Sequence, residues 1–328
     1  MAATSTSESA VPSAVSPAVP LSGRQFVLEN GAARAEIGSL AAVLRSLTVD
    51  GVQLTEPIGD DVLAPMGCGI VLAPWPNRVR DALWHLDGEP QQLDITEPPR
   101  RNAIHGLLRN TAYRALEYDA SSVTLGALIA PQHGWPFLLD TSVRYQLEPD
   151  GLTVTHGVQN LSSRRAPWAV GAHPYFRVGD VPVDQLTVTL TAQVRIQLDD
   201  RSNPAAEHPV EDPSGGGPGD LRSGRPLAGL TLDSPYGSLA NRGGRADVAW
   251  LTAPDGRTTT LWADPAFGWI QAYTPHEFPR PSGPGLAVAL EPMTAPPDAL
   301  NSGTDLIWLE PGESWSASWG VRSEGTKK

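Results

Sequence analysis

The chain is poor in cysteine and in clustered positive charge, and each shortage excludes a class of protein. Cys68 is the single cysteine among 328 residues, so no intrachain disulfide and no cysteine metal cluster is possible. Lys and Arg number 24 against 36 Asp and Glu, giving a formal charge of −12, and no basic run forms a patch. This balance argues against nucleic acid and anionic membranes as partners and favours a small ligand.

Long hydrophobic runs are also missing. The longest uncharged run, VLAPMGCGIVLAPWPN, is interrupted by Gly and Pro and is too short to span a bilayer. Residues 1–23 lack the basic and apolar regions of a secretory signal, and their Ala, Ser, Pro and Thr cannot bury a core. We therefore expect a disordered tail over 1–23 and a soluble protein of the cytoplasm.

Several catalytic signatures are absent as well. None of the seven histidines pairs with another at the spacing of a zinc-binding helix, so no metal site is expected. The chain has no phosphate-binding glycine loop with its lysine, and no Gly-x-Ser-x-Gly turn. These absences disfavour nucleotide hydrolysis and ordinary serine esterase chemistry.

What the sequence does contain is a repeated strand pattern. Four Asp-Gly pairs occur, and the clearest lies in TSVRYQLEPDGLTVTHGVQN, where two alternating segments flank a turn and predict a hairpin. ADVAWLTAPDGRTTTLWA repeats this chemistry, whereas no window sustains a helical apolar repeat and 32 prolines interrupt the chain. Residues 199–226, rich in Gly, Pro and Asp, are expected to form one long surface loop. The pattern predicts an all-β fold, a large antiparallel β-sandwich.

Four segments carry polar chemistry inside apolar or aromatic surroundings. LAPWPNRVRDALWHLDG holds Trp75, which either stacks on a sugar beside Asn77 and Arg78 or caps the core of a rigid loop. RRNAIHGLLRN holds His105 and WAVGAHPYFRVG holds His173, and a lone histidine is more often a satisfied core or loop residue.

In the fourth segment, LAVALEPMTAPPDALNSG, Glu291 follows an apolar run. Partial burial there would raise its pKa toward that of a useful general base, unless a cation offsets it; otherwise it is an exposed carboxylate at a strand end. Together the four segments supply two histidines, a carboxylate, an arginine and aromatic rings. That set suits acid–base chemistry on a polyhydroxylated small molecule.

At this point the chain resembles the aldose 1-epimerase (galactose mutarotase) family, and more narrowly its bacterial aldose epimerase-like subgroup. The matching motifs occur in the family's order over residues 24–322: PWPNRV, NAIHGL, GWPF, GAHPYF, LDSPY, QAYTP and EPMTAPPDALNSG. The resemblance implies a single β-sandwich domain over 24–322, followed by a tail over 323–328, with the site in a cleft across a concave sheet. It also implies a reaction without a cofactor, the interconversion of α and β anomers of a free hexose.

The resemblance also implies roles for individual residues. Glu291 would take the proton of the C1 hydroxyl and His173 would protonate the ring oxygen, while His105 would support the developing charge. Each such proton-transfer group contributes roughly 10²–10⁴-fold to the rate. Arg78 and Asp233 would hold sugar hydroxyls and Asn77 would support its loop. Trp75 and Trp135 are expected to contact the sugar.

The sequence departs from the family pattern at three positions. Ala82 stands where Gly is frequent, Leu300 where Phe is common, and Trp135 where Tyr is usual before Pro-Phe. We expect these changes to alter the shape of the pocket and hence the choice of sugar, and to leave the reaction class intact.

Two other functions remain open, together with a monomeric or homodimeric state. One is the epimerisation of a hexose 6-phosphate or of a sulfo-sugar such as sulfoquinovose, because arginine binds phosphate and sulfonate well. The arginines that would form such an anion site, or else a solvated loop surface, are Arg78, Arg80, Arg100, Arg101 and Arg109. The other is a non-catalytic carbohydrate-binding β-sandwich, which would have no need of a proton donor and acceptor pair.

Overall fold

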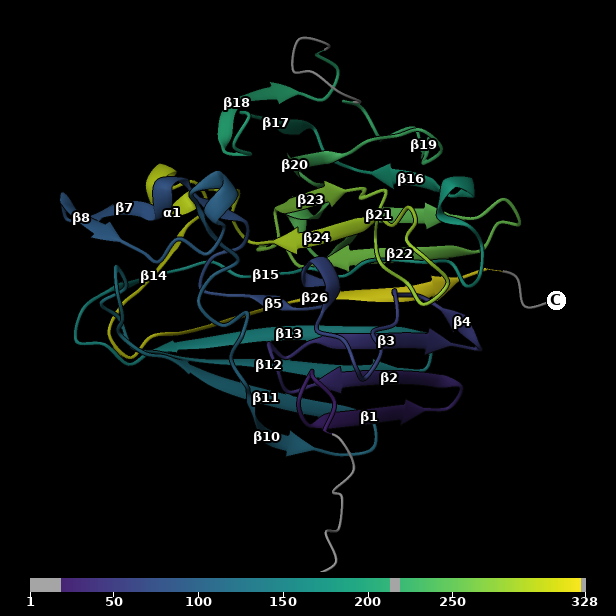
Figure 1. Cartoon of the computed structure of the whole chain (residues 1–328), viewed down its shortest axis with the longest axis horizontal. Coiled ribbons are helices and arrows are strands. Elements are labelled where there is room, and N and C mark those ends of the chain that lie inside the picture. Colours follow the sequence, from purple (N-terminus) through teal and green to yellow (C-terminus); the bar gives the residue numbers. More distant parts are fainter. Residues whose placement is uncertain (1–18, 213–218, 326–328) are drawn as a thin grey trace, which may run out of the picture.

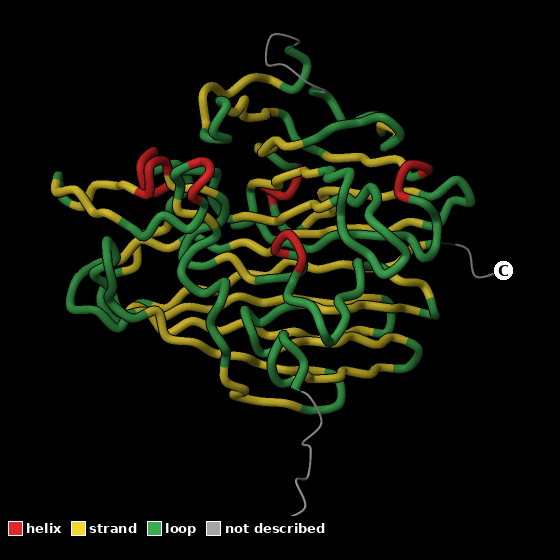
Figure 2. The backbone as a smooth tube through the Cα atoms, in the orientation of Figure 1, coloured by secondary structure: helices red, strands yellow, loops and turns green. Residues whose placement is uncertain are grey.

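The structure, a computed structural model, describes residues 19–212 and 219–325. Strands are the main regular structure of these residues, and the only α-helix among them is the single turn α1 (Ala299–Ser302). Figure 2 shows short helical segments scattered between long runs of strand. No helix in the described part is long and apolar enough to cross a membrane. The short 3₁₀ turns are η1 (Pro65–Gly67), η2 (Arg80–Ala82), η3 (Pro98–Arg100), η4 (Val183–Gln185) and η6 (Ala240–Gly243).

The largest sheet has nine antiparallel strands, in the order β10-β11-β12-β13-β26-β22-β21-β16-β19 (Figure 1). The strands are β10 (Arg114–Tyr118), β11 (Ser122–Ile129), β12 (Leu139–Glu148), β13 (Gly151–Asn160), β16 (Thr187–Leu190), β19 (Arg225–Pro226), β21 (Ala246–Thr252), β22 (Thr258–Ala263) and β26 (Ser314–Glu324). Side chains along β12 alternate between buried and half-buried, as its alternating sequence requires. The hairpins β12–β13 and β21–β22 confirm the two Asp-Gly turns predicted from the sequence.

A seven-stranded sheet, in the order β18-β17-β20-β23-β24-β15-β5, carries the residues of chemical interest. Its strands are β5 (Val71–Leu72), β15 (Gly171–Ala172), β17 (Val194–Leu198), β18 (Pro204–Pro209), β20 (Asp233–Gly237), β23 (Trp269–Tyr273) and β24 (Ala289–Met293). A single core cluster contains Leu251 of the nine-stranded sheet and Ile270 of the seven-stranded sheet. The two sheets therefore share one hydrophobic core, and the prediction of a large antiparallel β-sandwich is confirmed.

A four-stranded sheet packs on β11–β13 and lies in front of them in Figure 1. It contains β1 (Gln25–Asn30), β2 (Ala33–Gly38), β3 (Leu44–Val49) and β4 (Val52–Gln53). The hydroxyl of Tyr145 in β12 donates to the Ala42 carbonyl over 2.6 Å, which ties the two sheets together. Three short pairs complete the set: β6 (Arg78–Val79) with β9 (Ala103–Ile104), β7 (Leu83–Leu86) with β8 (Glu89–Gln92), and β14 (Ala166–Trp168) with β25 (Ile307–Leu309).

The structure corrects one predicted loop and both predicted ends of the domain. The expected surface loop over 199–226 contains the strands β18 and β19, and β18 pairs with β17 inside the seven-stranded sheet. The packed chain begins before residue 24, because Ser22 is buried and its carbonyl accepts from the Leu40 amide over 2.9 Å. β26 continues to residue 324, two residues beyond the expected end of the domain. The rest of both predicted tails, residues 1–18 and 326–328, lies outside the described residues.

Candidate active site

Two neighbouring strands bring His173 and Glu291 together. Gly171 of β15 pairs with Met293 of β24, so the residues that follow β15 lie beside the middle of β24. The His173 amide donates to the Ile70 carbonyl over 3.1 Å, and the His173 carbonyl accepts from the Gly69 amide over 2.8 Å. The imidazole Nε2 then lies 3.4 Å from Oε1 of Glu291. An imidazole and a carboxyl group thus lie side by side in the candidate site.

His105 reaches the same place from a different part of the chain. β6 pairs with β9, and the His105 amide donates to the Asn77 carbonyl over 2.8 Å. Gly106 has a φ of +71°, and a Cβ at that position would lie 2.0 Å from the Ala73 carbonyl oxygen, so only glycine fits there. The His105 ring meets the His173 ring edge-to-face, with centroids 5.3 Å apart. The structure thus brings His105, His173 and Glu291 to one site.

Two of the site residues adopt an unusual backbone conformation. Asn77 has a φ of +54° and His105 a φ of +63°, in the left-handed region that residues other than glycine enter rarely. Such conformations cluster at functional sites, where the surrounding structure holds them. Here the loops that carry Asn77 and His105 are bonded to each other, so each holds the other in place.

A chain of hydrogen bonds runs from Asn77 to Asp233 through a residue that sequence reasoning missed. Asn77 Nδ2 donates to Gln271 Oε1 over 3.2 Å, and Gln271 Nε2 donates to Asp233 Oδ1 over 2.7 Å. Asn77 Oδ1 accepts from the Arg78 amide over 2.9 Å, which supports the expected loop-holding role of Asn77. Gln271 lies directly opposite Glu291 in the β23–β24 register. The sequence shows Gln271 only as the first residue of the motif QAYTP, and the pairing of β23 with β24 shows that it lies beside Glu291.

Arg78 lies beside the site, but another carboxylate holds it. Its Nε and Nη2 bind the two oxygens of Glu97 at 2.8 and 2.9 Å, a bidentate pair that was not foreseen. Arg100 binds the same glutamate at 3.0 Å. The positive charge of Arg78 still acts on the site, since it opposes the rise in the pKa of Glu291. Its main contribution is therefore a fixed charge at the edge of the site.

The two tryptophans expected to contact the sugar do not lie at a surface. Trp75 is 2% exposed and Trp135 is fully buried, and their rings pack against each other with centroids 5.8 Å apart. Trp135 also contacts Trp84 and Phe137, deep in the core. The prediction that these indoles bind sugar is wrong, because a ring enclosed by other rings has no free face. Trp75 caps the core of its loop, which was the alternative reading of that segment.

The three departures from the family pattern are also buried. Ala82 and Leu300 lie in the same core cluster as Trp135. Ala82 has a φ of +52°, a conformation that glycine would adopt at lower cost. These positions therefore act on the packing behind the site and not by contact with a sugar.

The end of the EPMTAPPDALNSG segment fastens the loop that carries Asn77 and Arg78. The Asp298 amide donates to the Arg78 carbonyl over 2.7 Å, and Asp298 Oδ1 accepts from the Arg80 amide over 3.0 Å. Asn301 Nδ2 in α1 donates to the Leu83 carbonyl over 2.9 Å. The segment that supplies Glu291 thus also holds the loop that carries Asn77 and Arg78.

Burial controls the ionisation of the site. His173 and Glu291 are 4% and 2% exposed, whereas Asp233 reaches solvent. Burial raises the pKa of Glu291 well above its usual value, the negative Asp233 adds to this, and Arg78 opposes it. Burial lowers the pKa of His173 to about 4, and the positive charge of Arg78 acts in the same direction. Burial lowers the pKa of His105 as well, aided by His173, Arg78 and Arg109.

Several buried polar atoms in the site have no hydrogen-bond partner in another described residue. They are Nδ1 of His105, Nδ1 of His173 and Oε2 of Glu291. Buried polar atoms are paired in the great majority of cases, so three such atoms in one place mark a site prepared for a polar ligand. Within the described residues no group of three His, Cys, Asp or Glu side chains is arranged to hold a metal ion.

His173 is held from behind by an aromatic stack. The ring of Tyr175 lies against the imidazole with centroids 5.2 Å apart and planes 13° apart. Phe278 packs on Tyr175 at 4.7 Å, and the Arg280 guanidinium lies over Phe278 at 5.4 Å. The sequence shows Tyr175 only as one of two aromatic residues after His173. The fold makes it the residue that fixes the plane of the imidazole.

Known proteins share both the sequence pattern and the fold. The family model described as aldose 1-epimerase matches residues 24–322. The uncharacterized protein YihR of Escherichia coli K12 is 33% identical over 299 residues, covering 89% of this chain and 91% of that protein. A putative aldose 1-epimerase of E. coli K12 superposes with a TM-score of 0.77 at 20% identity, covering 92% of this chain and 99% of that one. A GalM/aldose epimerase homologue of Caenorhabditis elegans gives 0.78 at 17% identity, covering 93% and 99%. The chain therefore belongs to the aldose 1-epimerase family.

Proposed function

We propose that this member of the family is a mutarotase, which interconverts the α and β anomers of a hexose by opening and reclosing its ring. The observation that carries the proposal is the buried pair formed by His173 Nε2 and Glu291 Oε1, 3.4 Å apart. A protein that only binds sugar has no need of a buried proton donor and acceptor. A cytoplasmic location is part of the proposal and rests on the sequence alone, as does a monomeric or homodimeric state.

The pair is suited to hold one proton at neutral pH. A low-dielectric site disfavours net charge. The pair is neutral overall when it holds one proton, either as a carboxyl group beside a neutral imidazole or as a carboxylate beside an imidazolium. Both forms are favoured over a carboxylate beside a neutral imidazole. The raised pKa of Glu291 and the lowered pKa of His173 are the two signs of this preference. With one proton between them, each group is the acceptor whenever the other is the donor.

That single proton is sufficient for the reaction. In the form with the proton on His173, Glu291 takes the proton of the C1 hydroxyl while Nε2 gives its proton to the ring oxygen. The bond between C1 and the ring oxygen breaks and C1 becomes a carbonyl carbon, so the open aldehyde forms and the shared proton is now on Glu291. Rotation about C1–C2 presents the other face of the aldehyde. Reclosure returns both protons by the reverse path, as the reversibility of general acid–base catalysis requires.

The residues around the pair have supporting roles in this proposal. His105 is neutral, because its pKa is lowered, and a neutral imidazole can donate one hydrogen bond to the ring oxygen or to an adjacent hydroxyl. Asp233 accepts from sugar hydroxyls, and Gln271 fixes its orientation over 2.7 Å. Arg78 contributes positive charge that favours the carboxylate form of Glu291, the form that accepts the C1 hydroxyl proton.

Anomer equilibration tests the function directly. Freshly dissolved α-glucose and α-galactose are followed by polarimetry or proton NMR with and without the protein. We expect at least one sugar to equilibrate faster than its spontaneous rate, in proportion to the protein concentration. If no sugar in the panel is accelerated, the proposal fails and a non-catalytic sugar-binding sandwich replaces it.

The same test includes two anionic sugars, a hexose 6-phosphate and sulfoquinovose. Of the five candidate arginines, Arg101 and Arg109 make no ion pair with a described residue, and Arg101 is exposed. Arg80 pairs with Asp199, and Arg78 and Arg100 share Glu97. Arg109 is close enough to His105 to lower its pKa, and no ion pair engages it among the described residues. If the substrate is anionic, Arg109→Met lowers kcat/KM for the anionic sugars and leaves that for neutral hexoses unchanged. If kcat/KM for the anionic sugars is the same in the wild type and in Arg109→Met, an anionic substrate bound by Arg109 is excluded.

The pH dependence of the reaction tests the shared proton. Below the lowered pKa of His173, about 4, the pair takes up a second proton and Glu291 can no longer accept one. On the alkaline side, activity falls only when the shared proton leaves, at the raised pKa of Glu291. We therefore expect kcat/KM, corrected for the spontaneous rate, to stay level through ~6.5, where an unperturbed histidine titrates. An inflection near that pH would contradict the shared-proton account.

A further inference from the structure

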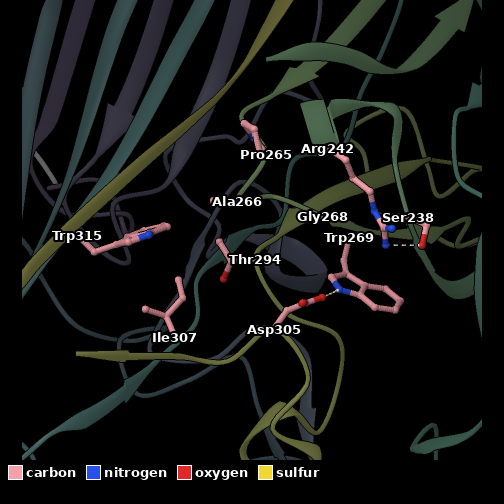
Figure 3. A pocket seen from close by; sticks show the side chains of 10 residues that line it. All are labelled: Ser238, Arg242, Pro265, Ala266, Gly268, Trp269, Thr294, Asp305, Ile307 and Trp315. Atoms are coloured by element: carbon pink, nitrogen blue, oxygen red, sulfur yellow. Dashed lines mark hydrogen bonds between the residues drawn. The ribbon is translucent and has the colours of Figure 1, made fainter. Parts of the chain in front are cut away.

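A cavity of about 540 Å³ lies apart from the candidate active site (Figure 3). It opens where the beginning of β26, the strand β25 and the beginning of β23 meet, and its lining includes none of His105, His173 and Glu291. Its volume falls within the range of small-molecule sites, roughly 300–1,000 Å³. Its lining combines indole rings with charged and hydroxyl side chains.

The two indoles of this cavity lie on different sides. In Figure 3, Trp315 and Ile307 form one side and Trp269 lies on the other, with Thr294 between them. Trp315 is half-buried, so part of its ring is available to a ligand. Trp269 is almost fully buried, and its Nε1 donates to Asp305 Oδ2 over 2.7 Å. The cavity therefore offers one accessible indole opposite a carboxylate held in a fixed direction.

The charged groups of the cavity are anchored but not neutralised by an ion pair. Nη2 of Arg242 donates to Ser238 Oγ over 2.7 Å. Across residues 19–212 and 219–325, neither Arg242 nor Asp305 takes part in an ion pair, and both are exposed. The cavity thus presents one carboxylate acceptor and one guanidinium donor, and its net formal charge is zero.

Two polar residues of the cavity have an unusual backbone conformation. Ser238 has a φ of +57° and Asp305 a φ of +50°, both in the left-handed region. Residues other than glycine enter this region rarely, and they gather at binding sites and catalytic sites. Two such residues supply polar side chains to the same cavity.

We propose that this cavity is a second carbohydrate site, which binds a neutral hexose. The C–H face of a pyranose packs on the Trp315 indole, as apolar faces of small ligands do on aromatic rings. Its hydroxyls donate to Asp305 and accept from Arg242. An anionic sugar is disfavoured because Asp305 would repel it, and a purely apolar ligand would leave both charged groups without a partner.

The binding is tested by ¹⁹F NMR on the full chain labelled with 5-fluorotryptophan and titrated with glucose or galactose. The Trp315 resonance, assigned with Trp315→Phe, is expected to shift saturably. Asp305→Ala and Arg242→Ala each weaken the binding roughly tenfold or more, because each removes a charge-assisted hydrogen bond. Trp308, half-buried under Arg165 at 4.7 Å, is the internal control and is expected not to shift.

The active-site variant Glu291→Gln separates this proposal from the proposed function. The Trp315 titration is expected to be the same in this variant as in the wild type, whether or not the wild type accelerates mutarotation. The proposal is overturned if Trp315 shows no saturable shift with either sugar. It is equally overturned if the shift persists unchanged in Asp305→Ala and Arg242→Ala, or if it disappears in Glu291→Gln.

Discussion

Under the proposed mutarotation, we expect Glu291→Gln to remove most of the acceleration of anomer exchange and to reduce kcat/KM roughly 10²–10⁴-fold. The amide has nearly the shape of the carboxyl group, but it cannot accept the proton of the C1 hydroxyl. It also cannot share a proton with His173 Nε2 across 3.4 Å, so both directions of the reaction lose their acceptor. The measurement is the initial rate of anomer equilibration by polarimetry, on the sugar that the wild type accelerates most.

Stability separates a chemical effect of this substitution from a structural one. Glu291 is 2% exposed, its Oε2 has no partner among the described residues, and burial raises its pKa. A group in this situation costs stability, as functional groups commonly do, so we expect Glu291→Gln to melt at the same temperature as the wild type or higher. Glu310→Gln, the same change at an exposed position, is the matched control and keeps full activity. Full activity in Glu291→Gln would remove Glu291 from the mechanism.

The strands of this protein could be predicted from local sequence because strand signals are local. The alternation in β12 and β13 and the Asp-Gly turn between them are contained in some twenty consecutive residues. β18 was missed because its sequence, PAAEHP, does not alternate and contains two prolines. Its pairing with β17 at the edge of the sheet makes it a strand, and an edge is where proline is tolerated.

Three residues that meet at the candidate site could be predicted from the sequence, but their surroundings could not. His105, His173 and Glu291 were identified by family motifs, and the structure brings them together. Trp75 was placed at the sugar because it stands beside Asn77 and Arg78, and Trp135 because it lies in the family motif GWPF. Each is buried by a ring from another part of the chain, Trp135 by Trp84 and Trp75 by Trp135. Burial of this kind depends on long-range packing, which local sequence does not encode.

The residues that surround Glu291, Arg78 and His173 are hidden from sequence for the same reason. Gln271 is distinguished only by facing Glu291 across two paired strands. Glu97 is one of many acidic residues until the fold places it against Arg78. A third example lies behind His173, where the buried Glu56 binds two arginines and its replacement is predicted to be strongly destabilising.

Glu56→Gln is expected to lower the free energy of unfolding by about 3–5 kcal/mol, the usual cost of breaking a buried ion pair by removing one partner. Glu56 is 1% exposed. Its Oε1 and Oε2 accept from Arg280 at 2.5 and 3.0 Å, and Arg177 approaches Oε2 at 3.4 Å. Glutamine keeps the shape but leaves two arginines without their counter-charge. Chemical denaturation of both proteins at neutral pH measures the difference.

The double variant Glu56→Gln/Arg280→Met shows whether charge is the cause. Removing both partners leaves fewer uncompensated charges, so the double variant is expected to be less destabilised than the sum of the two single variants. A loss below about 1 kcal/mol in Glu56→Gln, or simple additivity, would contradict the role of this ion pair.

The same ion pair tests how the imidazole is held. The Glu56 amide donates to the Tyr175 carbonyl over 2.9 Å, and the ring of Tyr175 stacks on His173. That backbone bond does not depend on the Glu56 side chain. At temperatures where the variant is folded, Glu56→Gln should therefore retain mutarotation within a few-fold of the wild type, in contrast to Glu291→Gln. A large loss of activity in a folded Glu56→Gln protein would mean that the charged cluster, and not the Tyr175 stack alone, sets the position of His173.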